Sequence, residues 1–119
     1  MKKYLLTTAI LFGAITMNAQ ADCAKINSGG GYCVGKGIVQ TLYPTAVHTY
    51  VGTTGNEKVL KCTPIGNGSL VYLKKTHKNY QTIYSTLLAS MMDPEKTVNL
   101  RIVPDSTGKC QIAYITINK

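Results

Sequence analysis

Acidic side chains are scarce in this chain. Five Asp and Glu residues stand against thirteen Lys and Arg, and the formal net charge at pH 7 is +8. An enzyme of this size needs a general acid, a general base or a nucleophile, and no two of these carboxylates are spaced to act as such a pair. The G-x-S-x-G and H-E-x-x-H motifs and a Gly-rich phosphate loop are absent too. These absences predict that the protein is not an enzyme.

Metal-ligand spacings are also missing. The four cysteines contain no C-x-x-C pair, and His48 and His77 are far from any ligand spacing. We therefore expect neither a metal site nor a cofactor. Small basic ribonucleases use two histidines and a lysine as acid, base and charge stabiliser. A small secreted ribonuclease is therefore kept as a minor alternative.

Long apolar runs are absent apart from one short stretch at the start. Two lysines precede the apolar run 5–17, which is too short to span a bilayer comfortably, and Ala19-Gln20-Ala21 is a small-x-small cleavage motif. Residues 1–21 are thus predicted to be a bacterial signal peptide that is cleaved. Residues 22–119 are long enough for one domain, which we expect to be secreted through the periplasm.

The cysteines that remain after cleavage are even in number, which implies disulfide bonds in an exported chain. Four cysteines allow three pairings, and the sequence alone does not choose among them. Cys23 and Cys33 bracket a Gly-rich turn at 28–31 and could close a small loop. Cys62 and Cys110 would then tie two strands across the core, which contributes about 4 kcal/mol in the chain-entropy model.

Residues 80–92 form the clearest pattern in the chain. Asn79 is expected to cap a helix that Asp93-Pro94 ends, and its apolar residues recur at helical spacing: Tyr80, Ile83, Tyr84, Leu87, Leu88 and Met91. The other face is small, polar and uncharged, and comprises Gln81, Thr82, Ser85, Thr86, Ala89 and Ser90. Roughly a quarter of residues in a typical domain are charged, yet residues 80–92 contain no charged residue. A small, uncharged second face of this kind suits contact with another protein surface.

The remaining pattern is one of short strands. Four are predicted before the helix and two after it, at 37–42, 47–51, 58–62, 69–74, 98–102 and 110–117. This order predicts a mainly β fold with one α-helix, in the form of a small closed or nearly closed barrel. An OB-fold, which is five-stranded and partly open, fits that description.

Tyrosine is abundant while tryptophan is absent, with eight Tyr and no Trp. Tyrosine has a stiff apolar ring and a hydrogen-bonding tip, so it suits the stacking and hydroxyl bonding that sugars need. The tyrosines in strand or loop positions are Tyr32, Tyr43, Tyr50, Tyr72 and Tyr114. The lysines are scattered apart from Lys74, Lys75 and Lys78. For a basic exported protein, an anionic glycan is a more natural partner than nucleic acid.

Four short motifs carry a resemblance to a known family. They are a glycine-hydrophobic first strand (36–42), a Cys-bearing strand (59–62), a Tyr-Ser-type helix block (84–90) and a Val-x-Leu-Arg-Ile strand (98–102). Together they resemble the B subunits of bacterial toxins with pentameric receptor-binding rings, above all the pertussis, typhoid and subtilase cytotoxin branch. The resemblance covers roughly residues 35–117.

The resemblance implies an OB-fold protomer of a homopentameric ring. Its helices would line a pore that the tail of a toxic A subunit enters, and the ring would bind sialylated host glycans. On this basis we expect Tyr32, Lys36 and Arg101 near the sugar, and the six uncharged helix residues in the assembly. The chain departs from the family at Lys36, because a serine at the matching position holds sialic acid in the subtilase and typhoid branch. A monomeric periplasmic inhibitor or binding module is the main alternative.

Overall fold

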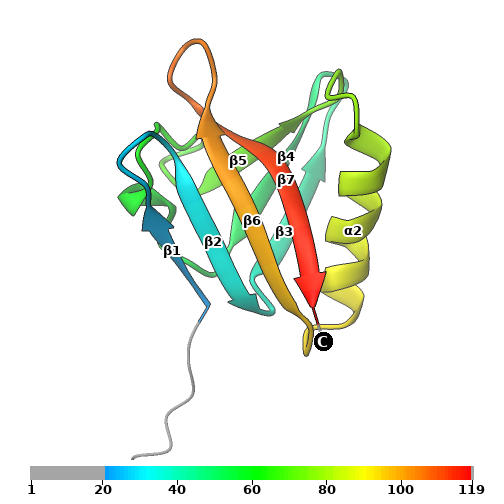
Figure 1. Cartoon of the computed structure of the whole chain (residues 1–119). Coiled ribbons are helices and arrows are strands. Elements are labelled where there is room, and N and C mark those ends of the chain that lie inside the picture. Colours follow the sequence, from blue (N-terminus) through cyan, green and yellow to red (C-terminus); the bar gives the residue numbers. More distant parts are fainter. Residues whose placement is uncertain (1–20, 119) are drawn as a thin grey trace, which may run out of the picture.

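The structure is a computed structural model and describes residues 21–118. Within this range it is mainly β, with a single α-helix and a seven-stranded sheet that curls into a half-barrel (Figure 1). The predicted mainly β class with one helix is confirmed, while the predicted signal peptide lies outside the described residues except for Ala21. The elements are β1 (Asp22–Lys25), β2 (Gly31–Lys36), β3 (Val39–Pro44), β4 (His48–Thr53), the 3₁₀ helix η1 (Glu57–Val59), β5 (Leu70–Lys74), α2 (Tyr80–Met92), β6 (Thr97–Pro104) and β7 (Cys110–Asn118).

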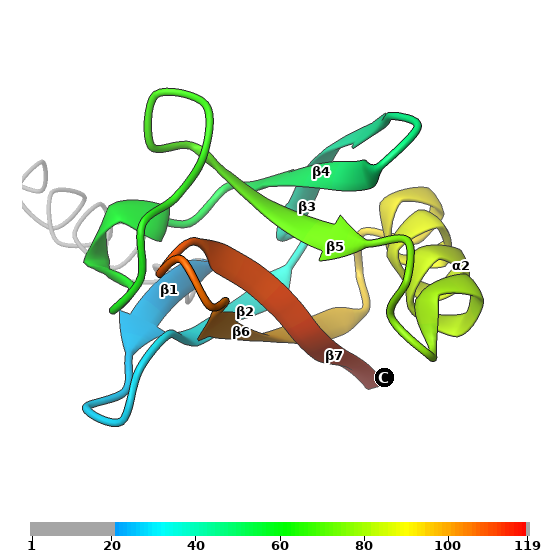
Figure 2. The same cartoon turned by 90° about the horizontal axis from the view of Figure 1, so that it is seen from above.

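The curl of the sheet follows from its strand order, β1-β2-β6-β7-β5-β4-β3. Strands β2 and β3 are consecutive in the chain, yet they lie near opposite ends of this order. Only Gly37 and Ile38 separate them, so Lys36 and Val39 are three residue steps apart and at most about 11 Å from each other. The two ends of the sheet must therefore approach each other. Gly37 makes the bend with a φ of 64°, a left-handed conformation that favours glycine. Figure 2 shows the two halves of the sheet facing each other, with α2 at one side.

Alternation along the strands divides inner from outer side chains. On β6, Val98, Leu100 and Ile102 are fully buried, while Asn99 and Arg101 lie on the outer face. On β4, Thr49 and Val51 are buried in the same way. The interior is filled mostly by aliphatic side chains from both halves of the sheet and from α2, including Ile38, Val71, Leu73, Ile83, Leu87 and Ile112. The curled sheet therefore has two separate outer faces, one on β2–β6–β7 and one on β3–β4–β5.

Helix α2 packs against β3 and β7 and is anchored at its first turn. The buried Thr49 hydroxyl is hydrogen-bonded to the Tyr80 hydroxyl at 2.8 Å. Just before the helix, His77 Nδ1 accepts a bond from the Asn79 N–H (2.9 Å), so Nε2 carries the proton and donates it to the Ala113 carbonyl (3.0 Å). Asn79 occupies the predicted capping position, but its side chain makes no capping hydrogen bond. The predicted helix bounds are confirmed.

The strand predictions contain two errors, one wrong strand and one omission. The segment 58–62 is not a strand: η1 begins at Glu57, and only isolated bridges follow it. Local hydrogen bonds explain the difference, because the buried Glu57 Oε2 accepts from the Thr53 N–H and hydroxyl at 2.8 and 2.7 Å, and Asn56 Oδ1 accepts from the Lys58 N–H. Such side-chain bonds give the backbone an alternative to a ladder. The second error is an omission, since β1 and β2 occupy the stretch around the Gly-rich turn.

Both disulfide pairings are confirmed. Cys23 and Cys33 are opposite residues in the β1–β2 ladder, and their bond staples that hairpin. Cys62 and Cys110 are 48 residues apart and bring Cα atoms to 5.1 Å, joining the segment after η1 to the start of β7. Two such bonds indicate an oxidising compartment outside the cytoplasm. In the described part of the chain, no helix has the length and apolar character to cross a bilayer.

Candidate functional site

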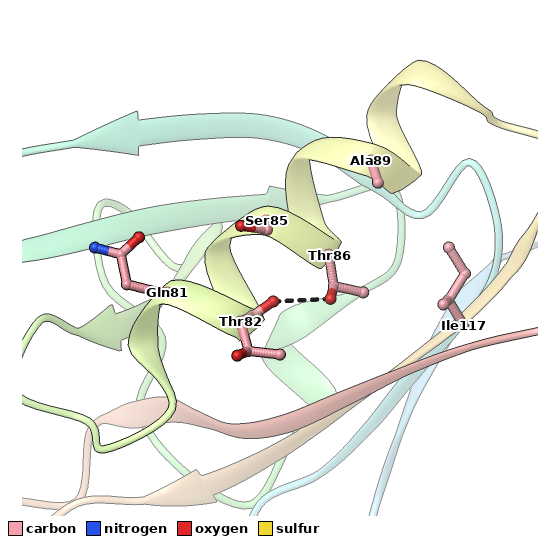
Figure 3. Close-up of a pocket in the computed structure, with 6 residues that line it drawn as sticks. All are labelled: Gln81, Thr82, Ser85, Thr86, Ala89 and Ile117. Atoms are coloured by element: carbon pink, nitrogen blue, oxygen red, sulfur yellow. Dashed lines mark hydrogen bonds between the residues drawn. The ribbon is translucent and has the colours of Figure 1, made fainter.

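Five of the six predicted assembly residues line one hollow. Gln81, Thr82, Ser85, Thr86 and Ala89 form its helix side and Ile117 of β7 forms the other, around a volume of about 450 Å³. Figure 3 shows the polar side chains arranged along one side of α2, with the Thr86 hydroxyl donating to the Thr82 carbonyl (2.8 Å). The hollow carries no charged side chain. It suits a neutral surface that packs against it better than a charged ligand.

The sixth residue, Ser90, was wrongly predicted to lie on the assembly face. Its side chain is buried, and its hydroxyl donates to the Leu87 carbonyl at 2.7 Å, so it faces the core. Leu88 and Met91 were predicted to face the core, yet they are 43% and 37% exposed, and Met92 is 81% exposed. The helix is thus rotated relative to the prediction, and large apolar side chains stand beside the hollow. Exposed apolar surface of this kind is typical of protein interfaces.

A second group of predicted residues meets on the outer face of β2–β6–β7. Tyr32 pairs with Arg101 across β2 and β6, and Arg101 pairs with Tyr114 across β6 and β7. The three side chains therefore form one row, which we call the arginine row. The guanidinium carbon of Arg101 lies 5.2 Å from the centre of the Tyr32 ring, a cation–π contact. The structure thus brings together Tyr32 and Arg101, two of the three residues expected near the sugar.

Arg101, the only arginine in the chain, is held by one of its nitrogens. Nη1 donates to the carbonyls of Gly29 (3.4 Å), Gly31 (3.2 Å) and Ile102 (2.8 Å). Its Nε and Nη2 donate to no other residue in the part of the chain that the structure describes. A guanidinium fixed in this way keeps donors free for the planar, two-point binding of a carboxylate.

Tyr114 is the member of the row that the site prediction missed. Its side chain is 45% exposed. A hydrogen bond with Tyr32 raises the pKa of Tyr114 above its ordinary value, and the charge of Arg101 offsets only part of this rise. Strand alternation does not reveal the position of Tyr114, because a side chain two residues after the buried Ile112 would be expected to point inward as well. A register shift next to Arg101 breaks simple alternation at this point, so only the ladder reveals the row.

Lys36, the third residue expected near the sugar, lies away from this row. It pairs with Thr97 at the far end of β2, four residues from Tyr32, which is about 13 Å along a strand. Its Nζ lies 3.9 Å from Glu95 Oε1 in an exposed ion pair. On the neighbouring strand β6, Asn99 lies between the partners of Tyr32 and Lys36, and its Oδ1 is buried without a hydrogen-bond partner among the described residues.

The two histidines lie in different environments. Both ring nitrogens of His77 bond to backbone atoms, so this residue has a structural role. His48 lies on the outer face of β4, with its ring 4.5 Å from that of Tyr72. Within residues 21–118, no three His, Cys, Asp or Glu side chains come together in a way that could hold a metal ion.

Comparisons with known proteins give no match: no family model, no curated protein and no solved structure matches the chain. Function therefore has to be inferred from the site itself. The site consists of an uncharged, partly apolar helix surface and a half-buried row on the outer face of β2–β6–β7, built around one fixed guanidinium.

Proposed function

We propose that this chain is a secreted glycan-binding subunit with an OB-fold that assembles into a ring. The ring binds sialylated glycans on host cells and delivers a toxic A subunit. The observation that carries the proposal is the state of Arg101. Its Nη1 is fixed by three carbonyls while its other donors stay free, and the two tyrosines flank it. Sialic acid combines a carboxylate with a pyranose ring, and these are the groups that an arginine and tyrosines recognise.

The strand order supports the OB-fold. In chain order, β3, β4, β5, β6 and β7 are five strands with α2 after the third, and β7 lies between β5 and β6. An OB-fold is a five-stranded, partly open Greek-key barrel. The strand that would close it is divided at Gly37, so that β2 pairs with β6 while β3 pairs with β4. Strand β1 is then an addition at one edge.

The exposed side of α2 supports assembly. Leu88 and Met92 lie next to the uncharged hollow, and a second copy of the chain would bury them. A ring would also place several weak sugar sites side by side, and linked sites raise overall affinity without new contacts. The monomeric binding module leaves these apolar side chains in water. The bonded nitrogens of His77 do not favour the ribonuclease alternative.

Oligomeric state tests the assembly. Residues 22–119 are purified, and their molar mass is measured by light scattering after size-exclusion chromatography at micromolar concentration. We expect a pentamer. Met92→Glu should dissociate it, since a charge would be buried at the interface, whereas Val47→Glu, which charges an exposed residue in the β3–β4 loop, should leave it intact. A monomeric wild-type protein contradicts the ring.

A glycan array tests the ligand. Wild-type protein should bind sialylated glycans and not their desialylated counterparts. Arg101→Ala should lose this binding, because hydrogen bonds to a charged group contribute about 1.5–3 kcal/mol, or about 10–150-fold in affinity. Val47→Ala, at an exposed position in the β3–β4 loop, is the control and should bind like the wild type. Equal binding of sialylated and desialylated glycans would remove the ligand assignment.

A further inference from the structure

The outer face of β3–β4–β5 carries an aromatic row of its own. Tyr43, Tyr50 and Tyr72 are opposite residues in consecutive ladders, and the rings of Tyr43 and Tyr50 are 5.9 Å apart. His48 lies two residues before Tyr50 on the same face, and its ring is 6.0 Å from Tyr50 and 4.5 Å from Tyr72. We call these four residues the tyrosine platform. It lies on the half of the sheet away from the arginine row.

The platform has a fixed end and an open end. Tyr72 is buried, and its hydroxyl donates to Asp105 at the start of the β6–β7 loop. Asp105 also accepts from the Thr107 N–H and hydroxyl (both 2.7 Å) and from the Lys109 N–H (2.9 Å), which closes the loop around the carboxylate. Tyr43 is 59% exposed at the other end. A rigid base with an exposed aromatic ring suits stacking of a ligand ring.

Positive charge lies next to the platform at Lys74, and two further lysines follow it in the chain. Lys74 is the cross-strand partner of His48 and therefore lies on the same face. Lys75 follows it, and its N–H donates to the Val47 carbonyl in the β3–β4 loop (3.4 Å). Lys78 lies three residues further on. These exposed lysines form no ion pair with another described residue, and the nearby Asp105 already accepts four hydrogen bonds.

We propose that the tyrosine platform and Lys74, Lys75 and Lys78 form a second binding site, for a polyanionic saccharide of sulfated uronic-acid type. Its pyranose rings would stack on Tyr43 and Tyr50, while the lysines, as flexible point charges, would meet several sulfates. Stacking and basic charge also suit single-stranded nucleic acid. The two disulfides indicate a compartment outside the cytoplasm, which favours the saccharide. This inference does not depend on the arginine row.

Calorimetric titration at low salt tests it with three probes: a sulfated heparin-type hexasaccharide, its desulfated form and a single-stranded oligonucleotide of equal charge. We expect the sulfated probe to bind most tightly. A triple variant, Lys74→Gln, Lys75→Gln and Lys78→Gln, should lose about tenfold or more in affinity, since exposed ion pairs contribute about 0.2–1 kcal/mol each. Tyr43→Ala should lose about fivefold, and Tyr43→Phe, which keeps the ring, much less.

A second triple variant provides the control for net charge: Lys25→Gln, Lys58→Gln and Lys61→Gln, all exposed residues outside the platform. It should change the affinity by less than about threefold. Equal losses in the two triple variants would show non-specific attraction and overturn the site. Oligonucleotide binding as tight as that of the sulfated probe would overturn the ligand. Arg101→Ala should retain sulfated-saccharide binding, so failure of the sialic acid proposal remains distinguishable.

Discussion

The two outer faces of the sheet carry tyrosines and cations in opposite arrangements. On β2–β6–β7 the cation is in the centre of the row, between Tyr32 and Tyr114, and backbone carbonyls hold it. On β3–β4–β5 the aromatic rings are contiguous, and the lysines lie at the side. A fixed guanidinium suits one carboxylate in one orientation, whereas flexible ammonium groups suit several anions without fixed geometry. In the two sites that we propose, the same residue types would give two different specificities.

The two disulfides close loops of very different length, and removing them separately gives the largest expected effect. The Cys62–Cys110 bond spans 48 residues, so replacing both cysteines by alanine should lower the free energy of unfolding by about 4 kcal/mol. The Cys23–Cys33 bond spans 10 residues, and the corresponding variant should lose about 2.7 kcal/mol. Urea denaturation measures both values. A larger loss for the Cys23–Cys33 variant would contradict the loop-entropy account.

Exchanging the cation type distinguishes the faces directly. Arg101→Lys should lower affinity for a sialoside by about tenfold or more, because an ammonium lacks the planar two-point geometry. Lys74→Arg, the reciprocal change, should leave affinity for the sulfated saccharide within about threefold, since the positive charge is kept and binding at this exposed site does not depend on its geometry. Titration calorimetry gives both numbers. If the two exchanges had equal effects, the difference between fixed and flexible cations would have no functional meaning.

Stability in acid depends on the hydrogen bond between Tyr72 of the tyrosine platform and Asp105. Hydrogen bonds from Tyr72, and then from Thr107, hold the pKa of Asp105 well below its usual range. A lowered folded-state pKa means that this stabilisation is present above the ordinary Asp pKa of about 4 and is lost as the pH falls further. Tyr72→Phe should therefore flatten the loss of stability below about pH 4. Denaturation at several pH values checks this, and Tyr43→Phe should keep the wild-type slope.

The smallest effect is expected at Lys36. It lies about 13 Å along β2 from Tyr32, and its ion pair with Glu95 is exposed, so Lys36→Ala should change sialoside affinity by less than about twofold. The same titration measures it. A loss as large as that of Arg101→Lys would mean that the sugar site extends along the whole strand.

Much of the fold could be predicted where periodicity is strong. The helix 80–92 and the alternation on β6 follow from local patterns, whereas the disulfide pairing found is one of the three that four cysteines allow. The segment GYCVGK of β2 was not predicted to be a strand, because its two glycines lower the strand propensity of the sequence. It is held instead by partners on both sides, β1 and β6. Long-range pairing of this kind leaves no local trace.

The candidate sites were predicted only in part, for a related reason. Tyr32 and Arg101 were expected near one ligand, but their contact and the place of Tyr114 depend on ladder register. Ser90 and Leu88 were assigned to the wrong sides of α2, because a stripe of six apolar residues is wider than the face that the barrel covers. The tyrosine platform joins strands that alternation alone cannot align.

The free donors of Arg101 provide the most direct test of the proposed function. Since the chain has one arginine, its Nε–Hε resonance is unambiguous in a nitrogen–proton NMR spectrum of the folded protein. Titration with sialyllactose should shift this resonance in a saturable manner, and lactose should not, because only the carboxylate meets the guanidinium. A resonance that stays in place with sialyllactose, or that moves equally with lactose, would contradict sialic acid binding at the arginine row.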